Sequence, residues 1–173
     1  MKILAIPGKM PITESWLFKI LSATQWCQEP VEMHRFAAWD NEQAFSVDKE
    51  LTYLPSGHFD VVITKSIGTL ITLKAKNTIS WDRLVLIGVA WSLFSESERD
   101  LLPALEDKGQ PVLIIQENHD PFGSYAEIAA AVAGKHNISC VEIMGDRHQY
   151  ANTEAIGKLI NHWIKETHSV AAL

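Results

Sequence analysis

The stretch Asp60-Val-Val-Ile-Thr-Lys-Ser-Ile-Gly-Thr-Leu-Ile-Thr-Leu73 decides the fold class, because its pattern changes from that of a strand to that of a helix. The run that ends at Ile63 is short, apolar and β-branched, which is typical of a strand buried in a parallel sheet. From Ile67 onward the apolar residues recur at the spacing of one helix face. The stretch therefore predicts a strand, a tight turn at Ser66 and a helix.

Ser66 lies on this turn, where a side chain would stand above the carboxyl end of the sheet, beside the first free amides of the helix. Gly68 has no Cβ, so the helix can pass close to neighbouring strands. A serine that only caps the helix would give the same local pattern. The remainder of the chain must distinguish the two interpretations.

Strands and helices alternate along the whole chain. Strands are expected at residues 2–6, 31–36, 61–64, 83–88, 112–116 and 139–144, and helices at 13–25, 41–51, directly after Ser66, and at 95–108, 124–134 and 153–166. The helices at 95–108 and 124–134 open with the Ser-x-x-Glu form of a capping box, and Pro103 is expected to kink the first or to start a later helix. This alternation predicts an α/β fold in three layers, with a doubly wound, mostly parallel sheet of six strands.

Size and composition predict a single domain over residues 1–173, with 47% hydrophobic residues. The 21 acidic residues outnumber the 15 basic ones, and the basic residues are scattered, so we expect no nucleic-acid partner. No apolar run is long enough for a signal peptide or a membrane span, which predicts a cytoplasmic protein without a membrane partner. The two cysteines, Cys27 and Cys140, show no zinc spacing, and we expect free thiols and no metal or cofactor.

Two loops at the predicted carboxyl edge of the sheet carry the partners that a reactive serine needs. Asp120 follows the fifth strand and His148 follows the sixth. His148 could take the proton of the Ser66 hydroxyl, and Asp120 could orient the imidazole. The amide of Ile67 and that of Lys9 or Met10, in the loop after the first strand, are the candidate donors to an oxyanion.

These loops resemble those of the alpha/beta-hydrolase superfamily, in the order nucleophile, acid, base. Thr64-Lys-Ser-Ile-Gly68 is similar to the nucleophile elbow, His119-Asp-Pro121 to the acid turn and Gly145-Asp-Arg-His148 to the base loop. Pro7-Gly-Lys-Met10 stands where that family often has its oxyanion loop. The chain resembles a small, cap-less member that lacks the two N-terminal strands. Thr64 departs from the pattern, because the family has a glycine there.

The resemblance implies a serine hydrolase that cleaves a small carboxylic ester or thioester through an acyl-enzyme, in an open and shallow site. Trp91 and Phe94 are candidates for its substrate pocket, and Lys65 is expected to be solvated or to flank the strand. Glu117 is the alternative acid, and His119 is a weaker rival of His148.

A catalytically inactive hydrolase fold that binds a ligand is the alternative function, because Thr64 replaces a glycine of the elbow. A nucleotide-binding module is disfavoured, because the nine glycines form no phosphate-binding pattern. A metal hydrolase built on His119, Asp120 and His148 lacks a supporting spacing. The sequence does not predict the oligomeric state or the identity of the substrate.

Overall fold

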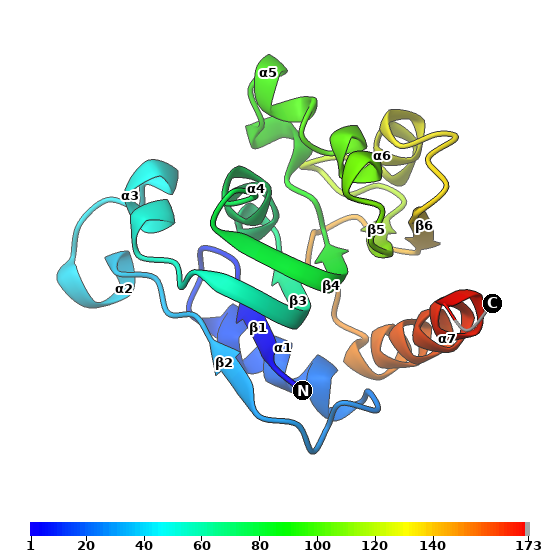
Figure 1. The fold of residues 1–173 in the computed structure, drawn as a ribbon. Helices are drawn as coiled ribbons and strands as arrows, with labels where there is room; N and C mark the ends of the chain where they lie inside the picture. Colours follow the sequence, from blue (N-terminus) through cyan, green and yellow to red (C-terminus); the bar gives the residue numbers. More distant parts are fainter. Residues whose placement is uncertain (172–173) are drawn as a thin grey trace.

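A six-stranded sheet forms the middle layer of the computed structural model, which describes residues 1–171 (Figure 1). All neighbouring strands are parallel, in the order β2-β1-β3-β4-β5-β6. The strands are β1 (Ile3–Ile6), β2 (Val31–Met33), β3 (Gly57–Lys65), β4 (Ile79–Ile87), β5 (Val112–Glu117) and β6 (Ile138–Ile143). The helical segments are α1 (Ile12–Ser22), α2 (Ala38–Asn41), α3 (Val47–Thr52), α4 (Ile67–Lys74), η1 (Trp91–Leu93), α5 (Glu96–Arg99), η2 (Pro103–Lys108), α6 (Tyr125–Ala131) and α7 (Thr153–Ala171). The predicted three-layer α/β fold with six strands is confirmed, and the sheet is parallel throughout.

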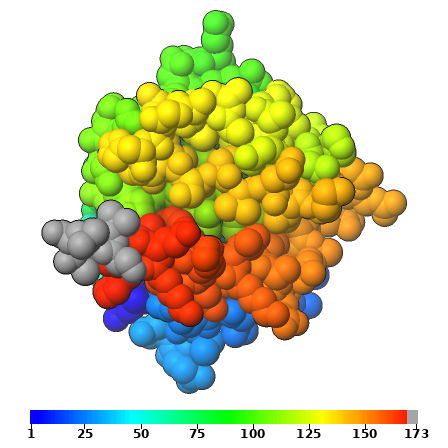
Figure 2. Space-filling model, turned by 90° about the vertical axis from the view of Figure 1, so that its right-hand side faces the viewer, coloured from blue at the N-terminus to red at the C-terminus, as the bar shows by residue number. Residues whose placement is uncertain are grey.

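Helices cover both faces of this sheet, and each face has its own apolar core. On one face α1 and α7 pack side by side, with Leu17 of α1 and Ile160 of α7 in the same buried cluster. On the other face α4 and α6 pack on the sheet, with Ile71 and Ile128 among the buried residues. Figure 2 shows α7, in orange to red, crossing the surface between the N-terminal segment in blue and the region of β6 and α6 in yellow. Strands buried on both faces explain why their sequences are nearly all apolar.

Two predicted helices are shorter than the sequence indicated. The predicted helix at 41–51 is confirmed only from Val47, where α3 begins, because α2 ends next to Glu42, whose φ of 57° is left-handed. The chain then turns inward at Phe45, which packs edge to face on Phe36, and Ser46 caps α3. The predicted helix at 95–108 is divided into α5 and the 3-10 helix η2, because Pro103 has no amide hydrogen and starts a new helix. Both predicted capping boxes are confirmed.

The strand order reverses at β1, because the chain passes from β1 to β2 on one side and then returns to β3 on the other. At such a switch point the loops at the carboxyl ends of the strands separate and leave a crevice. The loop after β1 and the turn after β3 border this crevice. The loops after β5 and β6 lie at the same edge, because all strands point the same way. None of the helices within residues 1–171 combines the length and the apolar character that crossing a membrane requires.

Candidate active site

Ser66 occupies a strained turn between β3 and α4. Its φ of 56° and ψ of −122° lie in a region that non-glycine residues rarely adopt. The surrounding backbone holds it there: the Ser66 amide donates to the Ile87 carbonyl at 3.0 Å, and the Thr69 amide donates to the Ser66 carbonyl at 2.9 Å. The Ser66 hydroxyl makes no capping hydrogen bond to α4. The helix-cap interpretation therefore does not describe this serine.

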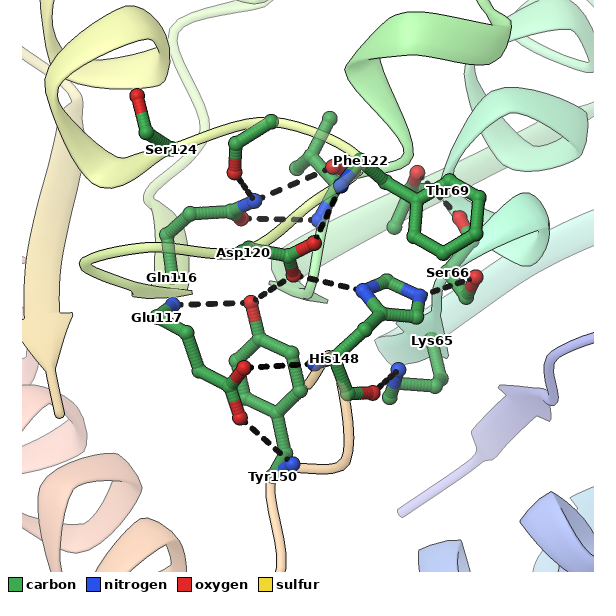
Figure 3. A network of polar contacts seen from close by, with 12 residues as sticks. Lys65, Ser66, Thr69, Gln116, Glu117, Asp120, Phe122, Ser124, His148 and Tyr150 are labelled. Carbon is green, nitrogen blue, oxygen red and sulfur yellow. Dashed lines mark hydrogen bonds and ion pairs between the residues drawn. The ribbon is translucent and has the colours of Figure 1, made fainter. Parts of the chain in front are cut away.

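The hydroxyl instead contacts a histidine that in turn contacts an aspartate (Figure 3). The distance from Ser66 Oγ to His148 Nε2 is 2.6 Å, and that from His148 Nδ1 to Asp120 Oδ2 is also 2.6 Å. An ionised carboxylate can only accept, so Nδ1 carries the hydrogen and Nε2 is free to accept from the serine. The structure thus brings together the three side chains that the sequence placed on separate loops.

Asp120 is buried and receives further hydrogen bonds. The Tyr150 hydroxyl donates to Oδ2 at 2.7 Å, and the Phe122 amide donates to Oδ1 at 2.8 Å. Burial alone would raise the pKa of Asp120, but the hydrogen bonds from His148, Tyr150 and Phe122 outweigh it and hold the pKa below its ordinary value. The carboxylate is therefore ionised at neutral pH, as an acceptor for the imidazole must be.

Glu117 supports the loop that carries the histidine. Its carboxylate accepts from the amide of His148 at 2.8 Å and from the amide of Tyr150 at 2.9 Å. Both residues have left-handed backbones, with φ of 63° and 50°, so these bonds stabilise an otherwise unfavourable loop. It is the carboxylate of Asp120, and not that of Glu117, that contacts the imidazole.

Tyr150 is a site residue that the sequence analysis did not identify. Its hydroxyl accepts from the Glu117 amide at 2.9 Å and donates to Asp120, which links the end of β5 to the acid. The ring is fully buried and lies edge to face with the imidazole of His148. An uncharged tyrosine two residues after the base has no distinctive motif, so only the fold reveals its role.

Lys65 is buried beside the nucleophile, whereas the sequence analysis expected it to be solvated or to flank the strand. Its ammonium donates to the carbonyl of His148 at 3.1 Å and lies over the rings of Tyr150 at 4.8 Å and Trp16 at 5.6 Å. Burial lowers its pKa from 10.5 to about 8, although Asp120 opposes the shift. The ammonium of Lys65 therefore stabilises the loop that carries His148, from the side opposite to Glu117.

The titration of Lys65 predicts a pH dependence of stability. Because the pKa is lower in the folded protein than in the unfolded chain, folding releases protons between about pH 8 and pH 10.5, and stability rises with pH in that window. Relative to Lys65→Met, the wild type should gain unfolding free energy between pH 7 and pH 10. Urea unfolding of both proteins at these pH values measures the gain, and an unchanged difference would contradict the burial of the charge.

A cavity of about 840 Å³ opens directly beside Ser66 and His148, where the sequence analysis expected a shallow site. Its lining comprises Gly8, Lys9, Met10, Ile12, Thr13, Trp16, Phe45, Val47, Lys65, Ser66, Ile67, Leu93, Phe122, His148, Gln149 and Ala151. Four segments far apart in the sequence contribute most of the apolar side chains: the start of α1, the entry to α3, the loop after β4 and the loop after β5. Most of the lining is apolar.

Trp91 and Phe94 do not line this cavity, although they were the predicted pocket residues. Both are buried, with rings 5.5 Å apart, and Trp91 also packs beneath the guanidinium of Arg99. Leu93, which lies between them and is half exposed, lines the cavity instead. The short 3-10 helix η1 directs Trp91 and Phe94, which are three residues apart, inward and leaves Leu93 exposed, so the correct loop was predicted with the wrong side chains.

The candidate oxyanion donors lie around the same cavity as Ser66. The loop after β1 is held by Thr13, whose hydroxyl accepts from the Gly8 amide at 2.9 Å and donates to the Met10 carbonyl at 2.7 Å. A Cβ on Gly8 would lie 3.4 Å from the Cβ of Ser66, so this loop passes directly beside the serine. Ile67 begins α4, and its amide therefore has no partner within that helix. The Lys9 and Met10 segment also lines the cavity.

The elbow is built around a close contact at Gly68. A Cβ there would lie 2.5 Å from both the Thr64 hydroxyl and the Pro7 carbonyl, and 2.8 Å from the Ile6 carbonyl. Thr64 is fully buried, and the turn at Ser66 forms with this threonine in place of the family's glycine. The turn therefore tolerates Thr64, whose hydroxyl occupies the space that the missing Cβ of Gly68 leaves.

Gly68→Ala is expected to destabilise the protein by roughly 3 kcal/mol, because two of the atoms it would strike belong to backbone that cannot move independently. Gly109→Ala is the control: a Cβ there meets open space, and only a positive φ of 76° opposes it, at a cost of about 1 kcal/mol. Urea unfolding of the two variants measures both costs. Equal losses would show that the close approach at Gly68 does not occur.

The remaining candidates lie apart from the site. The His119 side chain is exposed and is not the histidine that contacts Asp120. Asp146 is exposed and lies 3.8 Å from Arg147. Within residues 1–171 no group of three or more histidine, cysteine, aspartate or glutamate side chains is arranged to hold a metal ion. Cys27 and Cys140 are both free thiols.

Two solved structures share this architecture. One is a protein from Xanthomonas campestris pv. campestris assigned to the hydrolases of the alpha/beta superfamily, with a TM-score of 0.67 at 15% identity over 95% of this chain and 98% of the other. The second is the esterase domain of a Rhodothermus marinus protein, with a TM-score of 0.61 at 15% identity over 95% of this chain and 86% of that domain. No protein-family model and no curated protein matches the chain. The likeness establishes an alpha/beta-hydrolase fold.

Proposed function

We propose that this protein is a serine hydrolase that cleaves a carboxylic ester or thioester through an acyl-enzyme. The observation that carries the proposal is the unbroken chain of short contacts from Ser66 Oγ through His148 to the ionised Asp120. A serine hydroxyl is a weak nucleophile, and a base oriented by a carboxylate is the arrangement that activates it. The hydrolase and the esterase domain with the same fold support this proposal.

In this mechanism Ser66 Oγ attacks the acyl carbonyl carbon while His148 Nε2 removes the hydroxyl proton. Asp120 stabilises the imidazolium that forms. The amide of Ile67, with that of Lys9 or Met10, would donate to the oxyanion as it develops. When the bond to the leaving group breaks, His148 returns its proton to the departing alcohol or thiol. A water molecule, deprotonated by the same imidazole, then hydrolyses the acyl-enzyme and frees Ser66.

The strained backbone of Ser66 favours this function over an inactive binding protein. Strain of this kind costs of the order of 1–3 kcal/mol and is kept only where the surrounding structure enforces it. A binding protein needs neither the unfavourable φ at Ser66 nor those at His148 and Tyr150. The conformations of all three residues serve to bring the hydroxyl to the imidazole.

Pre-steady-state hydrolysis of p-nitrophenyl acetate tests the proposal. An acyl-enzyme that forms faster than it breaks down gives a burst of nitrophenol close to one equivalent of enzyme, and the intact mass rises by one acetyl group. Ser66→Ala should show neither signal. Slow release without a burst, at equal rates in wild type and Ser66→Ala, would instead support the inactive binding protein.

A further inference from the structure

The cavity beside Ser66 combines a large volume with a mostly apolar wall. A volume of about 840 Å³ lies in the upper part of the range that holds drug-sized ligands, far more than an acetyl group requires. This wall includes Met10 and Ile12 near the start of α1, Phe45 and Val47 near the start of α3, and Leu93 of η1. A ligand with few polar atoms would fit such a wall without leaving its own hydrogen-bonding groups unpaired.

Three large apolar side chains lie at the exposed part of the cavity lining. Met10, Ile12 and Leu93 are exposed by 62%, 72% and 50%, and all three line the cavity. Exposed apolar side chains that gather in one patch mark interaction sites, and ligand-binding grooves are one class of these. The exposed apolar surface therefore continues from the serine outward, as a chain-shaped ligand would require.

The charged groups exclude some substrate classes. Within residues 1–171, the titratable side chains that line the cavity are Lys9, Lys65 and His148, and no carboxylate is among them. The ammonium of Lys65 is already held by the His148 carbonyl and two aromatic rings, so the wall offers no acidic partner for a cationic substrate. Esters of amino acids with a free ammonium group are therefore poor candidates.

The direction of the ligand follows from the proposed mechanism. The leaving oxygen or sulfur must face His148, which protonates it, and the carbonyl oxygen must face the amides of Ile67 and the loop after β1. Met10 and Ile12 continue the wall from that loop. The group attached to the carbonyl carbon therefore meets the apolar wall, while the leaving group lies toward His148.

We propose that the substrate is an ester or thioester of a medium-length, unbranched fatty acid, hexanoyl to decanoyl, whose alkyl chain fills this cavity. The inference rests on the proposed serine hydrolase function and adds to it the class of the acyl group. Ser66 takes up the acyl group with its chain along Met10, Ile12 and Val47, and water releases the free fatty acid.

The test compares kcat/KM for p-nitrophenyl acetate, butyrate, hexanoate and octanoate. Each methylene buried in the cavity is expected to raise kcat/KM about fourfold until the chain fills it, so octanoate should exceed acetate by at least about a hundredfold. A flat or falling series with measurable acetate turnover would overturn the inference and leave the hydrolase function intact. If no ester is hydrolysed and Ser66 does not react with a fluorophosphonate, the proposed function itself fails.

A matched pair of variants on α1 tests where the alkyl chain of the substrate lies. Ile12 and Phe18 are both exposed apolar residues of this helix, but Ile12 lines the cavity and Phe18 does not. Ile12→Asp places a carboxylate in the wall, and the ratio of octanoate to acetate kcat/KM should fall by about tenfold or more. Phe18→Asp adds the same charge elsewhere and should leave the ratio unchanged. Equal ratios in both variants would show that the chain does not follow α1.

Discussion

Removing Ser66 or His148 is expected to abolish turnover almost completely, by up to roughly a million-fold in kcat for Ser66→Ala or His148→Ala. The structure explains why each loss should be so large. The hydroxyl and Nε2 lie 2.6 Å apart, which is the distance that transfer of the serine proton to the imidazole requires. Steady-state kinetics with p-nitrophenyl esters measure each loss.

The double variant tests whether the two residues act as a unit. Once either residue is absent, the other can no longer contribute to the attack. The kcat of the double variant Ser66→Ala with His148→Ala should therefore be little lower than that of either single variant. Losses that add would mean that the serine and histidine contribute independently. That result would contradict a shared mechanism even if each single variant were inactive.

Asp120→Asn is expected to lower kcat by up to about ten-thousand-fold while the protein remains folded. The substituted amide would present an NH₂ group to His148 Nδ1, which must then accept. The imidazole hydrogen moves to Nε2, where it can no longer take the serine proton. The Phe122 amide can still donate to the side-chain oxygen of asparagine, whereas the Tyr150 hydroxyl, which contacts the same position as His148, must accept from the new NH₂ group instead. The loop should therefore keep its shape.

Glu117→Gln is the matched control, because it makes the same isosteric change on the neighbouring carboxylate. Its two oxygens accept from the amides of His148 and Tyr150, and glutamine keeps one acceptor. We expect a loss in kcat of less than about a hundredfold, together with lower stability. If Glu117→Gln shows the larger kinetic loss, then the assignment of Asp120 as the orienting acid is wrong.

The alternation of strands and helices and the loops that carry Ser66, Asp120 and His148 could be predicted from the sequence because local signals encode them. Apolar runs marked the strands, and the acid and base each directly follow one of those strands. Parallel strands bring such positions to one edge whatever their separation along the chain. The three residues are therefore found without knowledge of side-chain packing.

The contacts that hold these three side chains in place could not be predicted in the same way, because they join segments that are distant in the sequence. Lys65 and Tyr150 lie 85 positions apart in the numbering, and nothing local shows that the ammonium lies over that ring. The 3-10 turn η1 also buries Trp91 and Phe94 and leaves Leu93 exposed, and no local pattern in the sequence indicates this turn. Leu93, and not Trp91 or Phe94, therefore lines the cavity.

The most direct test of the central claim is the intact mass of the protein after exposure to a fluorophosphonate, with peptide mapping, in wild type and Ser66→Ala. Reaction requires a serine activated by its neighbours, and an ordinary surface hydroxyl does not provide one. The account predicts one adduct, located on Ser66 and absent from the variant. A folded wild-type protein that gains no adduct, or that carries it on another residue, would contradict the assignment of Ser66 as an activated nucleophile.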